Sequence, residues 1–385
     1  MQRHQSPWPD PAGFVVQERP DDPVLLLAPA ALQAQARRFR AGFAGLVTYA
    51  VKANPRPEVL ANLVAAGITA FDVASPQEMA AVRAVHGQAV LHYNNPVRSE
   101  AEIARGVAAG VASWSVDDPA ELDKLAPVPQ GAEIAVRFAL PVAGAAYDFG
   151  AKFGADPDLA ARLLARVAAS GRVPALAFHP GTQCTDAGAW RAYIRAAAGI
   201  ARAAGLRLAR LNVGGGFAAD RDGSAPAPEP VLAAIAEETA RAFGPAAPAL
   251  LCEPGRAMVA EAASLLTRVK TIRRDGAAVY LNDGIYGGLA DLRDMGPTAR
   301  IRVLDPEGRP RRGAPVARTL FGPTCDSLDR LPEGMTLPAD TRPGDYVLFD
   351  GMGAYSLAMS TAFNGYGVAR VATVLSLAGH PRAAG

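Results

Sequence analysis

Several residues able to do chemistry stand at or near the ends of short apolar runs. Lys52 closes the run in VTYAVKANP, His179 that in LAFHPGTQC, and Glu253 that in LLCEPGR. Asp72 in FDVAS and Arg137 in IAVRF accompany two further runs. A lysine amine can form a Schiff base with an aldehyde, an imidazole can stack on an aromatic ring, and a carboxylate can hold a protonated ring nitrogen.

Two glycine-containing turns have the features of a phosphate site. Gly214, Gly215 and Gly216 follow one apolar run, and Gly255 and Arg256 follow the next. Glycines let backbone N–H groups approach an anion closely, and an arginine adds charge-assisted contacts. An aldehyde partner, a ring partner, an acid and a phosphate site are what pyridoxal 5′-phosphate requires, so the pattern predicts this cofactor.

Each of these features has a simpler explanation when it is taken alone. A glycine triplet is commonly a tight loop, and a single lysine or histidine is commonly a surface or structural residue. The prediction therefore depends on the combination and its order. Lysine is also rare, since Lys52, Lys124, Lys152 and Lys270 are the only lysines among 39 basic residues. Lys52 alone ends a strand-like run, which makes it the candidate for the Schiff base.

The elements expected to position these residues alternate between strands and helices. The expected strands are 46–51, 70–74, 89–93, 112–116, 133–139, 175–179, 208–213 and 249–253. Ala-rich stretches with helical spacing lie between them. Eight such strands in about 210 residues favour a closed (β/α)8 TIM-like barrel over an open doubly wound sheet. Both architectures place ligands at the carboxyl ends of the strands.

The pattern changes after residue 262. Short strand-like segments separated by Pro- and Gly-rich turns cover 277–281, 299–304, 316–320 and 346–349. We therefore expect the cofactor-binding barrel to span residues 28–262. A C-terminal all-β domain, Greek-key or sandwich-like, is expected over residues 263–385, with residues 1–27 joining it.

Composition narrows the class of protein. The 385 residues carry a formal charge of +2, which offers no general attraction for nucleic acid or an anionic membrane. No uncharged apolar run approaches the roughly 18 residues of a membrane span, and residues 1–14 lack the apolar core of a signal peptide. Cys184, Cys252 and Cys325 are too few and too scattered for a disulfide framework or a zinc site. We expect a cytoplasmic protein with no metal.

The motifs together resemble those of the fold-type III, pyridoxal-phosphate-dependent basic amino acid decarboxylases, which include ornithine, lysine and diaminopimelate decarboxylases. The resemblance extends over nearly the whole chain, and GPTCDSLD and FNGY are more similar to the ornithine/lysine branch. The motifs are YAVKAN (49–54), FDVASPQE (71–78), FHPGTQC (178–184), GGGF (214–217), EPGR (253–256), NDGIYGG (282–288), GPTCDSLD (322–329) and GAYSLAMSTAFNGY (353–366).

The resemblance implies a role for each barrel residue. Lys52 would form the Schiff base, His179 would stack on the cofactor ring, and Glu253 would bind the pyridine nitrogen. The residues implied around the phosphate, beside the glycine triplet, are Gly255, Arg256, Thr182 and Tyr355. Supporting residues would be Asp72, Glu78 and Arg137.

The resemblance also implies a homodimer with two shared active sites. Cys325 of the partner subunit would protonate the substrate α-carbon after carbon dioxide leaves. Asp326 of the partner subunit would pair with the distal amine of the substrate, and Tyr286 would lie nearby. Protonation at the α-carbon separates decarboxylation from transamination, and a positioned thiol can act as the general acid.

Two segments depart from the family pattern. FHPGTQC has Pro180 and Thr182 where the family usually has Val and Ser, and the larger departure follows NDGIYGG. Ornithine decarboxylases usually have a longer stretch after NDGIYGG, with an Asp preceding a His. Here the chain reads LADLRDMGPTARIRV, so Asp291 or Asp294 would take that place, with Arg293 between them. We expect decarboxylation of a basic L-amino acid, ornithine to putrescine or lysine to cadaverine. The alternatives are a larger or carboxylated substrate, diaminopimelate- or carboxyspermidine-like, and a non-catalytic binding protein.

Borohydride reduction of the protein loaded with pyridoxal phosphate, followed by peptide mapping, is expected to place the label on Lys52. The reason is that a Schiff base is reduced to a stable secondary amine on the lysine that formed it. A label on Lys124, Lys152 or Lys270 would overturn this assignment.

Overall fold

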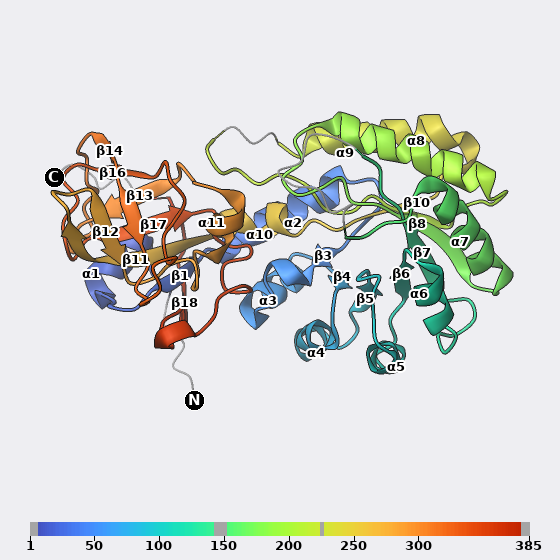
Figure 1. The fold of residues 1–385 in the computed structure, drawn as a ribbon, viewed down its shortest axis with the longest axis horizontal. Helices are drawn as coiled ribbons and strands as arrows, with labels where there is room; N and C mark the ends of the chain where they lie inside the picture. The colour runs from blue at the N-terminus through green and yellow to red at the C-terminus, as the bar shows by residue number, and fades with distance from the viewer. Residues whose placement is uncertain (1–6, 142–151, 224–226, 379–385) are drawn as a thin grey trace. The chain divides into compact units, whose positions relative to one another are not determined.

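The computed structural model describes residues 7–141, 152–223 and 227–378 of the chain (Figure 1). The chain divides into two compact units. The barrel unit comprises Gln35–Ala218 and Pro226–Met258, and the β unit comprises Met1–Ala34, Ala219–Ala225 and Val259–Gly385. The short segment Ala219–Ala225 therefore groups with the β unit although both its neighbours in sequence belong to the barrel unit.

A parallel sheet of nine strands forms the centre of the barrel unit. Its strands are β2 (Leu46–Val47), β3 (Tyr49–Ala50), β4 (Ala70–Val73), β5 (Val90–Tyr93), β6 (Ser113–Val116), β7 (Glu133–Arg137), β8 (Val173–Ala177), β9 (Arg210–Asn212) and β10 (Ala249–Cys252). The order of pairing is β2-β10-β9-β8-β7-β6-β5-β4-β3. Since β2 and β3 are consecutive pieces of the chain, the sheet closes on itself. The prediction of a (β/α)8-type barrel is confirmed, with the first strand in two pieces.

The interruption of the first strand corrects the prediction of one strand over 46–51. β2 pairs with β10, and β3 pairs with β4. Between them, the backbone N–H of Thr48 donates to the carbonyl of Cys252 over 2.9 Å, and its hydroxyl donates to the same carbonyl over 3.0 Å. The chain therefore leaves one neighbouring strand and joins the other within a few residues, which a continuous apolar run does not reveal.

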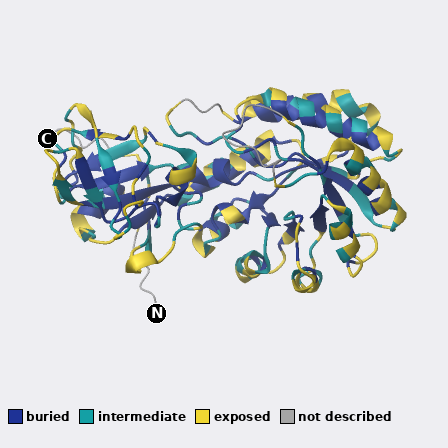
Figure 2. Ribbon diagram, viewed as in Figure 1, coloured by how far each residue is buried: buried dark blue, intermediate teal, exposed yellow. Residues whose placement is uncertain are grey.

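Helices surround the barrel strands (Figure 1). They are α2 (Pro29–Gly42), α3 (Pro57–Ala65), α4 (Pro76–Val85), α5 (Glu100–Ala108), α6 (Pro119–Lys124), α7 (Pro157–Ala169), α8 (Ala187–Ala203), α9 (Glu229–Phe243) and α10 (Arg256–Val259). Five begin after a Ser or Asp whose side chain accepts a backbone N–H of the first turn, which satisfies groups that have no helical partner. Figure 2 shows buried strands and helices with one exposed face. Of the described helices, none is long and apolar enough to span a membrane.

The β unit contains a mixed sheet of seven strands and a separate pair. The sheet consists of β1 (Val24–Leu27), β11 (Ala263–Arg273), β12 (Ala278–Leu281), β13 (Ile301–Leu304), β15 (Thr319–Phe321), β17 (Tyr346–Asp350) and β18 (Arg370–Thr373), and the pair of β14 (Pro315–Ala317) and β16 (Thr336–Pro338). β1 lies between β11 and β18. Two short helices are α1 (Pro11–Glu18) and α11 (Ala290–Met295). The predicted strand 316–320 is wrong as one element, because it divides between β14 and β15.

Candidate active site

The carboxyl ends of the barrel strands surround a cavity of about 240 Å³. Five residues predicted from the sequence line it together: Lys52, Asp72, Arg137, His179 and Glu253. The cavity is therefore at the end of the barrel where parallel strands generally present catalytic residues.

Barrel closure places Lys52 between two acidic side chains. Lys52 lies in the 3-10 turn η1 (Val51–Ala53) directly after β3, whereas Asp72 lies in the adjacent β4 and Glu253 directly follows β10. Burial raises the pKa of both carboxyl groups, and the charge of Lys52 opposes that rise. The lysine amine and both acids can thus act on one bound molecule.

The two carboxyl groups compete for a proton inside the barrel. Burial raises the pKa of Asp72. Burial first and the nearby charge of Asp72 second raise the pKa of Glu253, while a hydrogen bond from Asn212 and the charges of Lys52 and Arg137 oppose that rise. Groups whose pKa is set by such opposed effects are suited to exchanging protons with a ligand.

His179 is held as a neutral ring. Burial, followed by the charges of Lys52 and Arg137, moves the pKa of His179 well below its usual value. Its Nδ1 accepts the backbone N–H of Gly181 over 3.1 Å, which orients the ring. The ring lies against the glycine triplet, because a Cβ on Gly215 would stand 3.2 Å from Nε2. A neutral, oriented imidazole can stack on a flat cofactor.

The backbone conformation of the glycine triplet requires glycine at two of its three positions. Gly214 and Gly216 have φ of 72° and 87°, a left-handed conformation that other residues rarely adopt. A Cβ on Gly214 would lie 2.4 Å from the carbonyl oxygen of Phe178. The triplet is tied to the next turn because the Glu253 N–H donates to the Gly214 carbonyl over 2.8 Å. The backbone here carries no side chains and is held by this hydrogen bond, which suits an anion site.

Four further residues are predicted to surround the phosphate, and they come from different parts of the chain. Gly255 packs beside the turn of Lys52, since a Cβ there would lie 3.1 Å from the Cβ of Ala53. Arg256 is buried at the start of α10, and Thr182 is half-buried in the loop between β8 and α8. Tyr355 belongs to the β unit and has a positive φ of 55°. Lysine, acid, neutral imidazole and bare backbone together fit pyridoxal phosphate.

The predicted list missed several residues that line the cavity, among them Asn94, Asn212, Lys152 and Phe153. Asn94 directly follows β5 and Asn212 ends β9, so both lie at strand ends. They were not predicted because an amide is not a typical catalytic group. The Lys152 ammonium lies 5.0 Å from the centre of the Phe153 ring. Lys52 and Lys152 both line the cavity, but only Lys52 directly follows a barrel strand.

Cys325, Asp326 and Tyr286 lie together in the β unit. Cys325 is exposed, and it lines a cavity of about 440 Å³ with Asp326. The Tyr286 hydroxyl donates to the Asp326 carboxylate, and this hydrogen bond lowers the pKa of Asp326. The Cys325 N–H donates to Asn364 Oδ1 over 3.0 Å. A thiol and an ionised carboxylate are thus presented on one loop.

A buried carboxylate, Asp329, organises that loop. It accepts the backbone N–H of Ile285 over 3.0 Å, and the N–H and hydroxyl of Thr324 over 3.0 and 2.7 Å. The turns that carry Tyr286 and Cys325 are therefore joined through one side chain. The motif GPTCDSLD contains Asp329, but the sequence offered no reason to single it out.

Asp291 and Asp294, the two acids of the segment that follows NDGIYGG, are both paired with arginines. Asp291 is buried and lies 3.4 Å from Arg221, and Asp294 lies 2.9 Å from Arg293. Neither is among the described residues that line the 440 Å³ cavity. Their charges are already balanced within the β unit.

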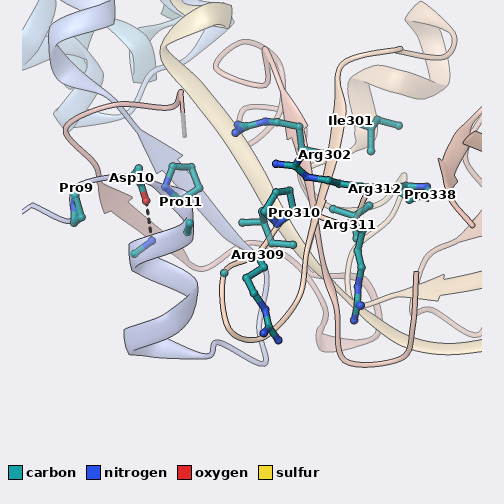
Figure 3. Close-up of a pocket in the computed structure, with 15 residues that line it drawn as sticks. Pro9, Asp10, Pro11, Ile301, Arg302, Arg309, Pro310, Arg311, Arg312 and Pro338 are labelled. Atoms are coloured by element: carbon teal, nitrogen blue, oxygen red, sulfur yellow. Dashed lines mark hydrogen bonds between the residues drawn. The ribbon is translucent and has the colours of Figure 1, made fainter. Parts of the chain in front are cut away.

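The β unit contains a further cavity. It measures about 810 Å³, lies within the β unit between the start of α1 and β13, and is lined by several arginines (Figure 3). Arg302 and Arg311 are held by the carboxylates of Asp350 and Asp345, each with a contact of 2.7 Å. None of the predicted site residues lines this cavity. The barrel cavity, which five of them line, is therefore the candidate active site.

The closed parallel barrel and its lysine, acid, imidazole and glycine turns define a pyridoxal-phosphate enzyme. A sequence model described as pyridoxal-dependent decarboxylase, pyridoxal binding domain, matches residues 30–260. The lysine/ornithine decarboxylase of Selenomonas ruminantium is 32% identical over 329 residues, which cover 83% of this chain and 81% of the relative. The chain therefore belongs to the pyridoxal-dependent decarboxylases, and its cofactor is pyridoxal phosphate.

Two further comparisons agree with this family. The ornithine decarboxylase of Caenorhabditis elegans is 30% identical over 341 residues, covering 83% of this chain and 79% of the relative. The crystal structure of a Vibrio vulnificus lysine/ornithine decarboxylase complexed with putrescine matches with a TM-score of 0.80 at 28% identity, covering 94% of this chain and 96% of that one. These findings favour an enzyme over the non-catalytic binding protein.

Substituting Asp329→Ala is expected to lower the free energy of unfolding by about 3 kcal/mol, because three donors lose a buried acceptor. Urea unfolding followed by circular dichroism would measure the loss. Asp22→Ala, at an exposed position, is the matched control and is expected to leave stability within about 0.5 kcal/mol. Equal stability of the two variants would contradict the organising role of Asp329.

Proposed function

We propose that this enzyme removes the α-carboxylate of a basic L-amino acid, converting ornithine to putrescine or lysine to cadaverine. The observation that carries the proposal is the ionised carboxylate of Asp326 beside the Cys325 thiol. A carboxylate at a substrate cavity calls for a cationic partner, which the distal ammonium of these substrates supplies. The relatives are named as decarboxylases of ornithine, or of both lysine and ornithine.

The residues divide the chemistry between them. Pyridoxal phosphate supplies the electron sink that accepts the electron pair left when carbon dioxide departs. Lys52 would anchor the cofactor through its side-chain amine. Glu253 would hold the ring nitrogen of the cofactor, and the neutral ring of His179 would lie against its face. The Cys325 thiol delivers a proton to the α-carbon, which completes the amine product.

We further propose that two copies of the chain form the active sites together. Three apolar side chains near Cys325 are strongly exposed, with exposed fractions of 71% for Leu328, 42% for Phe363 and 39% for Tyr366. Phe363 packs against Tyr286, with ring centres 5.0 Å apart. An exposed apolar group around a reactive loop suits an interface. A second copy would cover this surface and receive the loop at its barrel cavity.

The ion pairs of the segment that follows NDGIYGG support a basic substrate. Arg293 is balanced by Asp294, so it offers no unpaired cation to a carboxylated diamino acid. Arg221 likewise contacts Asp291. The alternative of a diaminopimelate- or carboxyspermidine-like substrate has no support from these contacts.

Release of carbon dioxide from a panel of amino acids tests the substrate class. We expect turnover of L-ornithine or L-lysine and little of meso-diaminopimelate. Asp326→Asn removes the charge while keeping the shape, and is expected to raise KM for the basic substrates about tenfold or more. Asp340→Asn, at a half-buried carboxylate of the same unit, is the control. Preference for diaminopimelate, or an unchanged KM in Asp326→Asn, would refute the proposed substrate class.

Mixing two inactive variants tests the shared site. Lys52→Ala damages the barrel cavity and Cys325→Ala damages the loop. If each site combines one barrel with the loop of the other copy, a mixed dimer contains one intact site. Random mixing is then expected to restore about one quarter of the wild-type activity. No recovery, although subunits exchange as judged by mass spectrometry, would show that each chain builds its own site.

A further inference from the structure

Two asparagine amides converge on the carboxylate of Glu253. Asn94 directly follows β5 and Asn212 ends β9, and each donates from Nδ2 to Glu253 Oε1. The amide of Asn212 is oriented by its other end, because Oδ1 accepts the backbone N–H of Gly214 over 2.9 Å. Asn212 therefore connects the glycine triplet to Glu253.

Such donors matter because Glu253 shares its cavity with a second acid. Burial and the charge of Asp72 favour the protonated form of Glu253, so they raise its pKa. Amide N–H groups pointing at one oxygen favour the ionised form. Burial raises the pKa of Asp72, and the charge of Lys52 followed by the side chain and backbone of Asn94 oppose that rise. One amide thus serves both acids, and the other links one acid to the glycine triplet.

The arrangement leaves one oxygen of Glu253 for a ligand. Among the described residues, both of these side-chain hydrogen bonds end on Oε1. Oε2 remains, and Glu253 lines the cavity. A protonated ring nitrogen placed there would meet an ionised, oriented acceptor.

We propose that Asn94 and Asn212 are positioning residues that keep Glu253 ionised, so that the shared proton resides on the ring nitrogen of pyridoxal phosphate. The inference rests on the proposed role of Glu253 as the partner of that nitrogen. No proton is gained or lost, because one proton is divided between Oε2 and the nitrogen. Its residence on the ring strengthens the electron sink for decarboxylation.

The ¹⁵N chemical shift of the ring nitrogen, measured on holoenzyme carrying labelled cofactor, reports where the proton resides. Asn212→Asp keeps the shape and the acceptor for the Gly214 N–H, but removes the donor and adds a negative charge. We expect its signal to move towards the unprotonated value and kcat to fall about tenfold, with a smaller change in KM. Asn94→Ala removes the other donor without adding charge, and is expected to shift the signal in the same direction.

Asn62→Asp is the matched control, because it makes the same chemical change on α3, where the Asn62 amide donates to the Glu58 carbonyl over 2.8 Å. Its ring-nitrogen signal is expected to equal that of the wild type. Glu253→Gln tests the role of Glu253 separately from that of the two asparagines. An unchanged signal in Glu253→Gln would refute the proposed role of Glu253. A changed signal there, with wild-type signals in both Asn212→Asp and Asn94→Ala, would overturn the role of the asparagines.

Discussion

The hydrogen bonding that closes the barrel between β10 and the first strand is the constraint on which the active-site geometry depends. The chain leading to Lys52 first pairs with β10 and then with β4. Thr48 secures the crossing by donating twice to the carbonyl of Cys252. Because parallel neighbours present their carboxyl ends on one face, Lys52 is brought to Glu253, at the far end of the barrel sequence.

Closure of the barrel also brings several charged side chains into one cavity, and burying these charges costs free energy. Lys52 and Arg137 share one small cavity with Asp72 and Glu253. Ionised groups removed from water are costly unless opposite charges and hydrogen bonds replace the lost solvation. Here Lys152 adds a third cation beside the two acids, and amides supply further donors. The same balance makes the position of a proton sensitive to each neighbour, a property useful for catalysis.

The β unit carries the Cys325 thiol and the Asp326 carboxylate on one loop. Such loops are usually mobile unless buried groups tie them down. Asp329 does so by accepting three hydrogen bonds from the turns that carry Cys325 and Tyr286. Asp326 is in turn oriented by the Tyr286 hydroxyl. The loop is therefore ordered from beneath while its thiol remains exposed, as a surface that meets another copy would require.

The sequence by itself determined the barrel and the strand-end positions of Lys52, His179 and Glu253, because short apolar runs and the turns that end them are local properties. It misjudged the first strand as continuous and passed over Asn94 and Asn212. A break in pairing depends on which strands become neighbours, and an amide becomes significant only when it reaches a particular carboxylate. Those relations join residues far apart in the chain, so only the tertiary structure decided them.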